Sequence, residues 1–149
     1  MKKALALFLA LCMMFALCAC GKEAITADTF AERMEGMGLL VFQEEDEIDG
    51  EMVKNAYVGG SEEEDPIVWF YELDSKEHAR NGYENYKADL VDKSGSSSEV
   101  TTPSSGFYSK KTSEDVQMVA FVDNTVMWGG ASLAHAQELE AIFETMGYK

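Results

Sequence analysis

The run Ile67-Val68-Trp69-Phe70-Tyr71, with the helical pattern that follows it from Asp74 to Asp92, sets the fold class of this 149-residue chain. Five consecutive apolar residues predict either a strand that is covered on both faces or a strand that places Trp69 or its neighbours on a binding surface. Asp74 and Glu77 form a capping pair for the helix. The apolar stripe of that helix consists of Ala79, Tyr83, Tyr86 and Leu90. The sequence therefore predicts a strand that leads directly into an amphipathic helix.

Elements of the same two kinds precede this segment. Thr26 can cap a helix that Gly38 ends. Two strands are then predicted, at Leu39–Phe42 and Met52–Val58. The acid-rich segment 44–51 separates them and is expected to form an exposed turn.

Residues 93–109, which follow the central helix, have only weak secondary-structure patterns. Lys93–Ser98 has the composition of a flexible Ser/Gly loop. Val100–Ser109 predicts only a weak strand, because Pro103 interrupts it and proline cannot donate to a sheet ladder.

The carboxyl-terminal segment is better defined. Val116–Val122 and Thr125–Trp128 are predicted strands, and Asp123-Asn124 between them favours a tight hairpin because both residues tolerate turn geometry. Ser132 is expected to cap a final helix that Gly147 ends.

In order, these elements are helix, three strands, helix, three strands, helix. Strands joined by short turns are antiparallel, and a helix with one apolar stripe must cover a sheet face. The predicted fold is therefore α+β, an antiparallel sheet of about five or six strands with helices packed mainly on one face. The order is compatible with a degenerate helix–three-strand repeat, because Met37-Gly38-Leu39 and Met146-Gly147-Tyr148 end helices in the same way.

Composition excludes several classes of protein. The chain has 12 Lys and Arg against 27 Asp and Glu, for a formal net charge of -15. Nucleic-acid binding requires clustered cations, so no nucleic-acid partner is expected. Hydrophobic residues make up 46% of the chain, which argues against disorder. A single domain over residues 26–149 is expected.

The amino terminus has the features of an export signal. Met1-Lys2-Lys3 is followed by sixteen uncharged residues, Ala4 to Ala19. That is short for a bilayer span of about 20 residues but typical of a signal-peptide core. The core ends in Leu17-Cys18-Ala19-Cys20, which resembles the lipobox of bacterial lipoprotein precursors: Leu, a tolerant position, Ala or Gly, then Cys.

This resemblance implies processing and a location. Cys20 would receive a diacylglycerol thioether, and a signal peptidase would cleave between Ala19 and Cys20. Residues 1–19 are then a signal peptide, and residues 20–25 are the lipidated cysteine with a short tether. The expected location is the extracytoplasmic face of the cell membrane, with the membrane as a partner through the lipid on Cys20.

Two further observations bear on the exported part. All three cysteines, Cys12, Cys18 and Cys20, lie in the amino-terminal segment, so no intramolecular disulfide is expected after cleavage. The end of the chain, from Asp123 to Tyr148, is similar to small lipoproteins of Gram-positive bacteria, a resemblance that implies no activity.

The sequence contains no catalytic or cofactor motif. His78 and His135 each stand at the first turn of a predicted helix, with no second His or Cys at ligand spacing. No Gly-x-Ser-x-Gly elbow and no phosphate-binding glycine loop occurs. No catalytic residue, cofactor or metal site is therefore predicted.

The carboxylates leave two questions open. Segment 45–51 places acids at positions 1, 3 and 5 of a calcium loop and Gly50 at position 6, but Ala56 stands where a bidentate Glu is needed. A high-affinity site is excluded, whereas weak calcium binding stays open beside a solvated acidic turn. The same carboxylates keep open a second function, a carboxylate-dependent hydrolase that acts on cell-envelope material.

Aromatic residues give the remaining clue to function. Core packing explains most of them, and a binding surface is expected at the strands that carry Trp69, Tyr71 and Trp128. The sequence favours a lipid-anchored extracytoplasmic domain that binds an envelope protein or a small solute.

Overall fold

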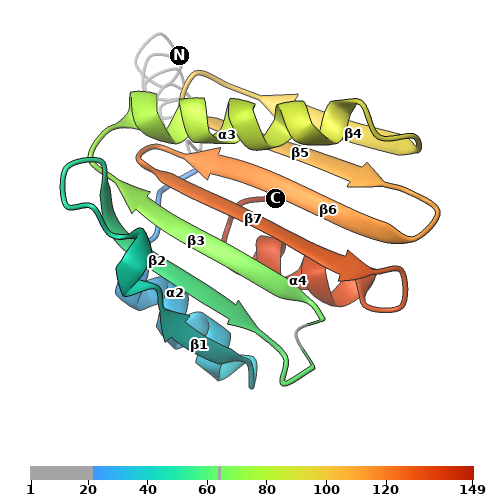
Figure 1. The fold of residues 1–149 in the computed structure, drawn as a ribbon, viewed down its shortest axis with the longest axis horizontal. Helices are drawn as coiled ribbons and strands as arrows, with labels where there is room; N and C mark the ends of the chain where they lie inside the picture. Colours follow the sequence, from blue (N-terminus) through green and yellow to red (C-terminus); the bar gives the residue numbers. More distant parts are fainter. Residues whose placement is uncertain (1–21, 64) are drawn as a thin grey trace, which may run out of the picture.

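The computed structural model describes residues 22–63 and 65–149 (Figure 1). The predicted signal peptide and Cys20 lie outside the described residues. The elements in chain order are α2 (Ala27–Gly36), β1 (Leu40–Gln43), the single 3-10 turn η1 (Glu45–Glu47), β2 (Val53–Gly60), β3 (Ile67–Leu73), α3 (Lys76–Val91), β4 (Ser96–Thr101), β5 (Ser105–Lys111), β6 (Asp115–Val122), β7 (Thr125–Ser132) and α4 (Ala136–Thr145).

The strands form one antiparallel sheet in the order β1-β2-β3-β7-β6-β5-β4. The α+β class with an antiparallel sheet is confirmed, but the sheet has seven strands, and the prediction of five or six is too low. The missing strand is β4, which includes part of the predicted Ser/Gly loop. Its pairing with β5 runs from Ser96 opposite Lys111 to Thr101 opposite Gly106. Pro103 lies between the two strands and so separates them.

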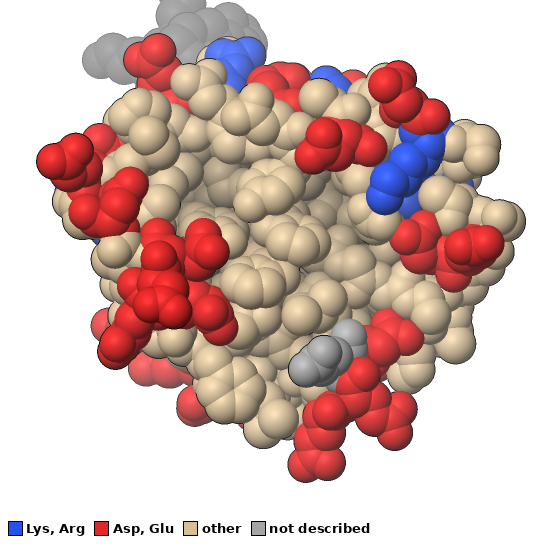
Figure 2. Space-filling view, viewed as in Figure 1, with Lys and Arg blue, Asp and Glu red and all other residues tan. Residues whose placement is uncertain are grey.

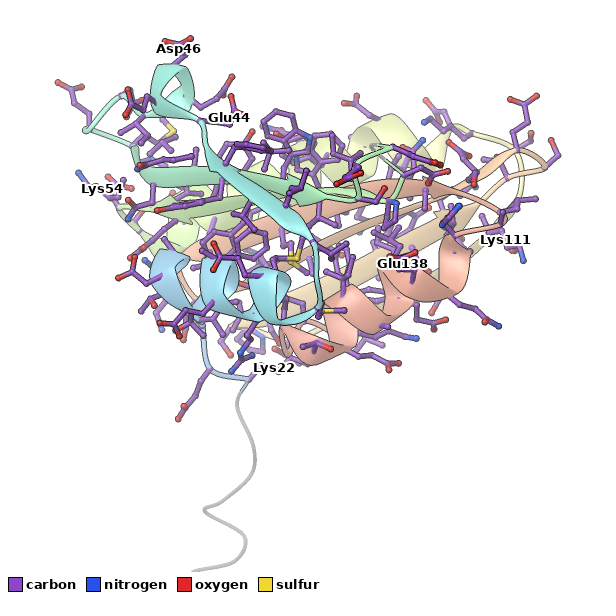
Figure 3. The ribbon with its side chains drawn as sticks, turned by 90° about the horizontal axis from the view of Figure 1, so that it is seen from below. Lys22, Glu44, Asp46, Lys54, Lys111 and Glu138 are labelled. Atoms are coloured by element: carbon purple, nitrogen blue, oxygen red, sulfur yellow. The ribbon has the colours of Figure 1, made fainter. Side chains whose placement is uncertain are left out.

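The three helices in the described part of the chain cover the two faces of the sheet unequally. Helices α2 and α4 pack into one core cluster on one face, and α3 packs into a second cluster on the other. Figures 1 and 3 show α2 and α4 on one side of the sheet and α3 on the opposite side. We call the α2/α4 side the closed face and the α3 side the open face. Two helices out of three on one face agree with the predicted arrangement.

The degenerate repeat is not supported by this arrangement. The first helix of the proposed repeat, α2, lies on the closed face, whereas the second, α3, lies on the open face. The second half also has four strands where the first has three. The two halves are therefore not equivalent in structure.

The closed face carries the larger core. Phe30 of α2 stacks on Phe70 of β3, with ring centroids 4.7 Å apart and an interplanar angle of 13°. Leu139, Ile142 and Phe143 of α4 are fully buried on the same side. Each such side chain contributes about 1.5–3 kcal/mol by leaving water, so this face supplies much of the stability of the fold.

The open face is only partly covered. Helix α3 packs on β6 and β7 and touches the adjoining strands β3 and β5. Its residue Tyr83 contacts Phe121 of β6, with ring centroids 5.1 Å apart. The register pairs Phe42 with Val58 and Val58 with Trp69, which puts Phe42 on the open face, where 60% of it is exposed. No described helix covers that part of the sheet.

The predicted helix ends are right at some positions and wrong at others. Thr26 caps α2, since its hydroxyl accepts the backbone N–H of Thr29. Gly147, with φ +83°, follows the last turn of α4 as predicted. The N-cap of α3 is Ser75 and not Asp74. Ser132 does not cap α4: it ends β7, where it pairs with Asp115 of β6, and its backbone N–H donates to Asp65 Oδ1 at 3.0 Å. The N-cap position of α4 is His135.

Candidate functional site

The sheet register brings the three predicted site residues onto one surface. Trp69 of β3 stands directly opposite Trp128 of β7, and Tyr71 stands opposite Val126. Residues two apart on a strand point to the same side, so Trp69, Tyr71 and Trp128 all lie on the open face. The two indole rings are 5.8 Å apart with an interplanar angle of 10°. Both tryptophans of the chain are therefore on this face.

A fourth aromatic residue joins them from the helix. The Tyr86 ring of α3 stacks against Trp128, with centroids 5.4 Å apart and an interplanar angle of 30°. The sequence places Tyr86 in the apolar stripe of the helix, beside Tyr83, and this prediction is only partly right. Tyr83 is fully buried, whereas Tyr86 is half-buried at the margin of the stripe. Helical spacing alone does not separate these two positions.

Beside Tyr86 the open face is hollowed into a cavity of about 520 Å³, which we call the aromatic groove. Small-molecule sites typically have volumes of about 300–1,000 Å³. The groove lies between α3, β3 and the η1–β2 connection. Its apolar and aromatic walls are formed by Met52, Val53, Tyr71, Leu73, Tyr86 and Val126.

A second cavity of about 240 Å³ adjoins the groove on the other side of Tyr86. Trp128 lines this smaller cavity, together with Leu90 and Lys93. The three predicted residues thus have different positions: Tyr71 lines the groove, Trp128 lines the smaller cavity, and Trp69 lines neither of the two but stacks on Trp128.

The polar groups of the groove come from η1 and α3. Glu47 lines it from η1, and His78, Asn81 and Asn85 line it from α3. Its lining contains no Lys or Arg. His78 Nδ1 lies 2.6 Å from Asp74 Oδ1. In Figure 2 the hollow is free of charged side chains at its centre, and acidic side chains stand at several places around its margin.

Burial affects the polar groups of two rings, Tyr71 in the groove and Trp128 in the smaller cavity. Burial raises the pKa of the Tyr71 phenol well above its usual range, and the neighbouring Tyr86 and Glu47 raise it further. Tyr71 is therefore a neutral phenol. The Trp128 indole nitrogen is buried and has no hydrogen-bond partner in residues 22–63 and 65–149. It lies near the Tyr71 hydroxyl, but the contact falls short of hydrogen-bond geometry.

The acidic loop beside the groove uses one carboxylate to order its own backbone. Asp49 Oδ1 accepts the backbone N–H groups of Glu51, Met52 and Val53 at 3.0, 2.7 and 2.9 Å. These bonds hold the Asp49 pKa below its usual value. In the part of the chain that the structure describes, no three His, Cys, Asp or Glu side chains are grouped so that they could hold a metal ion.

Within the described ranges, no helix has the length and hydrophobicity needed to cross a bilayer.

Comparison with known proteins supports the fold and nothing finer. No family model matches the chain, and no curated protein matches it. Among solved structures, it is similar to the crystal structure of a GTP binding regulator from Thermotoga maritima, with a TM-score of 0.53 and 13% sequence identity. The alignment covers 83% of this chain and 88% of that chain. At this identity the likeness indicates a shared fold only.

Proposed function

We propose that this protein is a lipid-anchored, extracytoplasmic domain that binds a small solute in the aromatic groove. The observation that carries the proposal is the grouping of four half-buried aromatic residues on the open face, Trp69, Tyr71, Tyr86 and Trp128. Two of them, Tyr71 and Tyr86, line the aromatic groove. A large aromatic side chain that stays partly exposed contributes less to folding stability than a fully buried one, so a cluster of them at a surface often marks a binding site. A concave, mainly apolar hollow with a few polar groups is the usual form of a small-molecule site.

A nucleotide polyphosphate does not suit this groove. The Thermotoga protein is described as a GTP binding regulator, but phosphates are held by cations or by glycine-rich backbone loops. The groove lining offers neither Lys nor Arg and includes the carboxylate of Glu47. The proposed solute is therefore not a polyanion.

A carboxylate-dependent hydrolase is not put forward as a second function. The general acid of such an enzyme needs a carboxyl group whose pKa is raised. Among the described residues, every carboxyl group whose pKa departs from its usual value has a lowered pKa, and hydrogen bonding is the main cause in each case. These groups are Asp49, Asp65, Asp74, Glu99 and Asp115.

Lys22, the first described residue, and the groove lie on opposite sides of the domain. Lys22 Nζ donates to the Tyr148 carbonyl at 2.9 Å, and Ala24 and Ile25 pack against the closed-face core. Figure 3 has Lys22 below α2 and α4, away from the open face. A lipid on Cys20, two residues before Lys22, is within about 7 Å of extended chain. The closed face then turns toward the bilayer, and the groove opens away from it.

Solute binding is tested by equilibrium dialysis of the domain against a small-molecule extract of the cell envelope, followed by mass spectrometry of what is retained. We expect the wild-type domain to enrich a compound that the Tyr86→Ala variant does not. Phe42→Ala is the matched control, because Phe42 is an exposed aromatic residue of the same face that lies outside the groove. Equal enrichment by Tyr86→Ala, or no enriched compound at all, would contradict the proposal.

Anchoring is tested by fractionating cells that express the full chain. Cys20→Ala should leave unprocessed precursor or release the domain from the membrane fraction, whereas Cys18→Ala should be processed and retained as the wild type is. A Cys20→Ala product that is cleaved after residue 19 and still membrane-bound would show that no lipid on this thiol holds the protein.

A further inference from the structure

The aromatic walls of the groove favour a particular charge in the ligand. The π faces of Tyr71 and Tyr86 carry partial negative charge, and a cation near such a face gains about 0.5–1 kcal/mol when exposed and about 2 kcal/mol when desolvated. Both rings line the groove and both are half-buried. A positively charged group held there would be partly removed from water and would meet two rings.

The charged side chains around the groove also favour a positively charged ligand. Glu47 lines the groove and lies close enough to Tyr71 for its negative charge to act on that phenol. The basic side chains nearby keep their charge, but neither Lys93 nor Lys54 lines the groove. Lys93, on the far side of Tyr86, donates to Gln117 Oε1 at 3.0 Å, and Lys54 Nζ donates to the Gly50 carbonyl.

His78 is the remaining group in the lining that could carry positive charge, and Asp74 offsets it. The His78 ring nitrogen and the Asp74 carboxylate are in direct contact, and both lie at the start of α3. A protonated His78 therefore adds little net charge to the groove. The lining of the groove therefore combines aromatic rings with the Glu47 carboxylate, which forms no ion pair with the described residues, and it includes no Lys or Arg.

We infer that the ligand of the groove carries an organic ammonium group with apolar substituents, such as a quaternary ammonium, held between Glu47 and the rings of Tyr71 and Tyr86. This inference rests on the proposed function, that the groove binds a small solute. A quaternary ammonium has no N–H donors to satisfy, so it loses little when it leaves water for an aromatic wall. The apolar wall of Met52, Val53 and Leu73 accommodates the rest of the molecule.

Choline and its neutral isostere 3,3-dimethyl-1-butanol are the probes that separate charge from shape. Both tryptophans are on the open face, so intrinsic fluorescence follows binding, with calorimetry as an independent readout. We expect choline to bind at least tenfold more tightly than the isostere, which corresponds to about 1.4 kcal/mol. Equal affinities would overturn the inference but leave solute binding intact. Binding of neither probe by a domain that still retains an envelope compound through Tyr86 would also overturn it.

Two neighbouring carboxylates provide the matched variants. Glu47 lines the groove, whereas Glu45 belongs to the same turn of η1 and does not line it. We expect Glu47→Gln to weaken choline binding several-fold without changing the affinity for 3,3-dimethyl-1-butanol, and Glu45→Gln to change neither. An equal loss in both variants would indicate general attraction by an acidic surface and would overturn the site. Urea unfolding of each variant checks that the fold is unchanged.

Discussion

The two faces of this sheet use aromatic residues in opposite ways. On the closed face, Phe30 and Phe70 are stacked and fully buried under α2. On the open face, Trp69 and Trp128 are also stacked but remain half-exposed beside α3. Because burial of apolar area is the main source of folding energy, the closed face gains fully from its rings and the open face does not. Folding therefore accounts for Phe30 and Phe70 fully, as it does for the buried Tyr83 and Phe121 of the open face, but it gains less from the half-exposed pair Trp69 and Trp128.

Strand β3 contains this contrast in adjacent residues. Phe70 points to the closed face, and Tyr71 points to the open face and lines the groove. Phe70→Ala should lower the free energy of unfolding by about 3–5 kcal/mol, because it leaves a large cavity. Tyr71→Ala should cost less than half as much, because its ring is already half in water. Urea unfolding measures both changes: the shift of the midpoint gives the loss of stability as long as the m-value is unchanged.

The comparison would break if Tyr71→Ala cost as much as Phe70→Ala. Tyr71 would then be an ordinary core residue, and its place in the groove would follow from packing alone.

Adjacent glycines of β7 give a sharper and smaller contrast. A methyl group added at Gly129 would stand 2.8 Å from the Ile67 carbonyl oxygen and 2.9 Å from Leu139 Cδ1, on the closed face. At Gly130, on the open face, its first contact would be Gln117 Cγ at 3.7 Å. Gly129→Ala should therefore destabilise the fold by about 1–3 kcal/mol through overpacking. Gly130→Ala should be neutral or stabilise it by up to about 1 kcal/mol, since alanine restricts the unfolded chain.

Thermal and urea unfolding of both variants would check these signs. A destabilising Gly130→Ala would mean that the open face is packed as tightly as the closed one.

Sequence patterns predicted the elements of the closed face better than the coverage of the open face. In β3 the pattern Ile67 to Tyr71 is apolar at every position, which is compatible with burial on both sides. The structure instead alternates, with Val68 and Phe70 buried and Trp69 half-buried. A one-dimensional pattern identifies apolar side chains but not whether a helix is present to cover them.

Strand β4 was missed for the opposite reason. All six of its residues are exposed and four are Ser or Thr, so no alternation of apolar and polar residues marks it as a strand. Backbone pairing with β5 forms it, from Thr101 opposite Gly106 to Ser96 opposite Lys111, and that pairing is not visible in the residues of β4 alone.

The candidate site was predicted in part. Trp69, Tyr71 and Trp128 were identified as surface candidates because they lie on strong strands, and the register places them together. Tyr86 and Glu47 come from α3 and η1, and their approach to the same hollow depends on which face α3 covers. An amphipathic stripe does not specify that face, so no local pattern could have assembled the groove.

The smallest effect on stability is expected for the contact between α3 and the edge strand β4. Lys87 of α3 forms an ion pair with Glu99 of β4 and lies 5.7 Å above the Tyr83 ring. The Lys87 hydrogen bond holds the Glu99 pKa below its usual value. The lowered pKa means that this contact stabilises the fold above the ordinary glutamate pKa and that the gain is lost as pH falls through the folded-state pKa.

Glu99→Gln should therefore lower the free energy of unfolding at pH 7 by at most about 1 kcal/mol, because the side chain of Glu99 is 40% exposed and solvent screens the pair. At pH 3, below the ordinary glutamate pKa, the difference between the variant and the wild type should be smaller, because the stabilisation is lost as pH falls through the lowered folded-state pKa. The control is Glu114→Gln, an exposed glutamate before β6 with no ion pair to the described residues, which should change neither value. Urea unfolding at both pH values decides the case. An equal loss for Glu99→Gln at the two pH values would mean that the charge of Glu99 does not tie this edge strand to the open face.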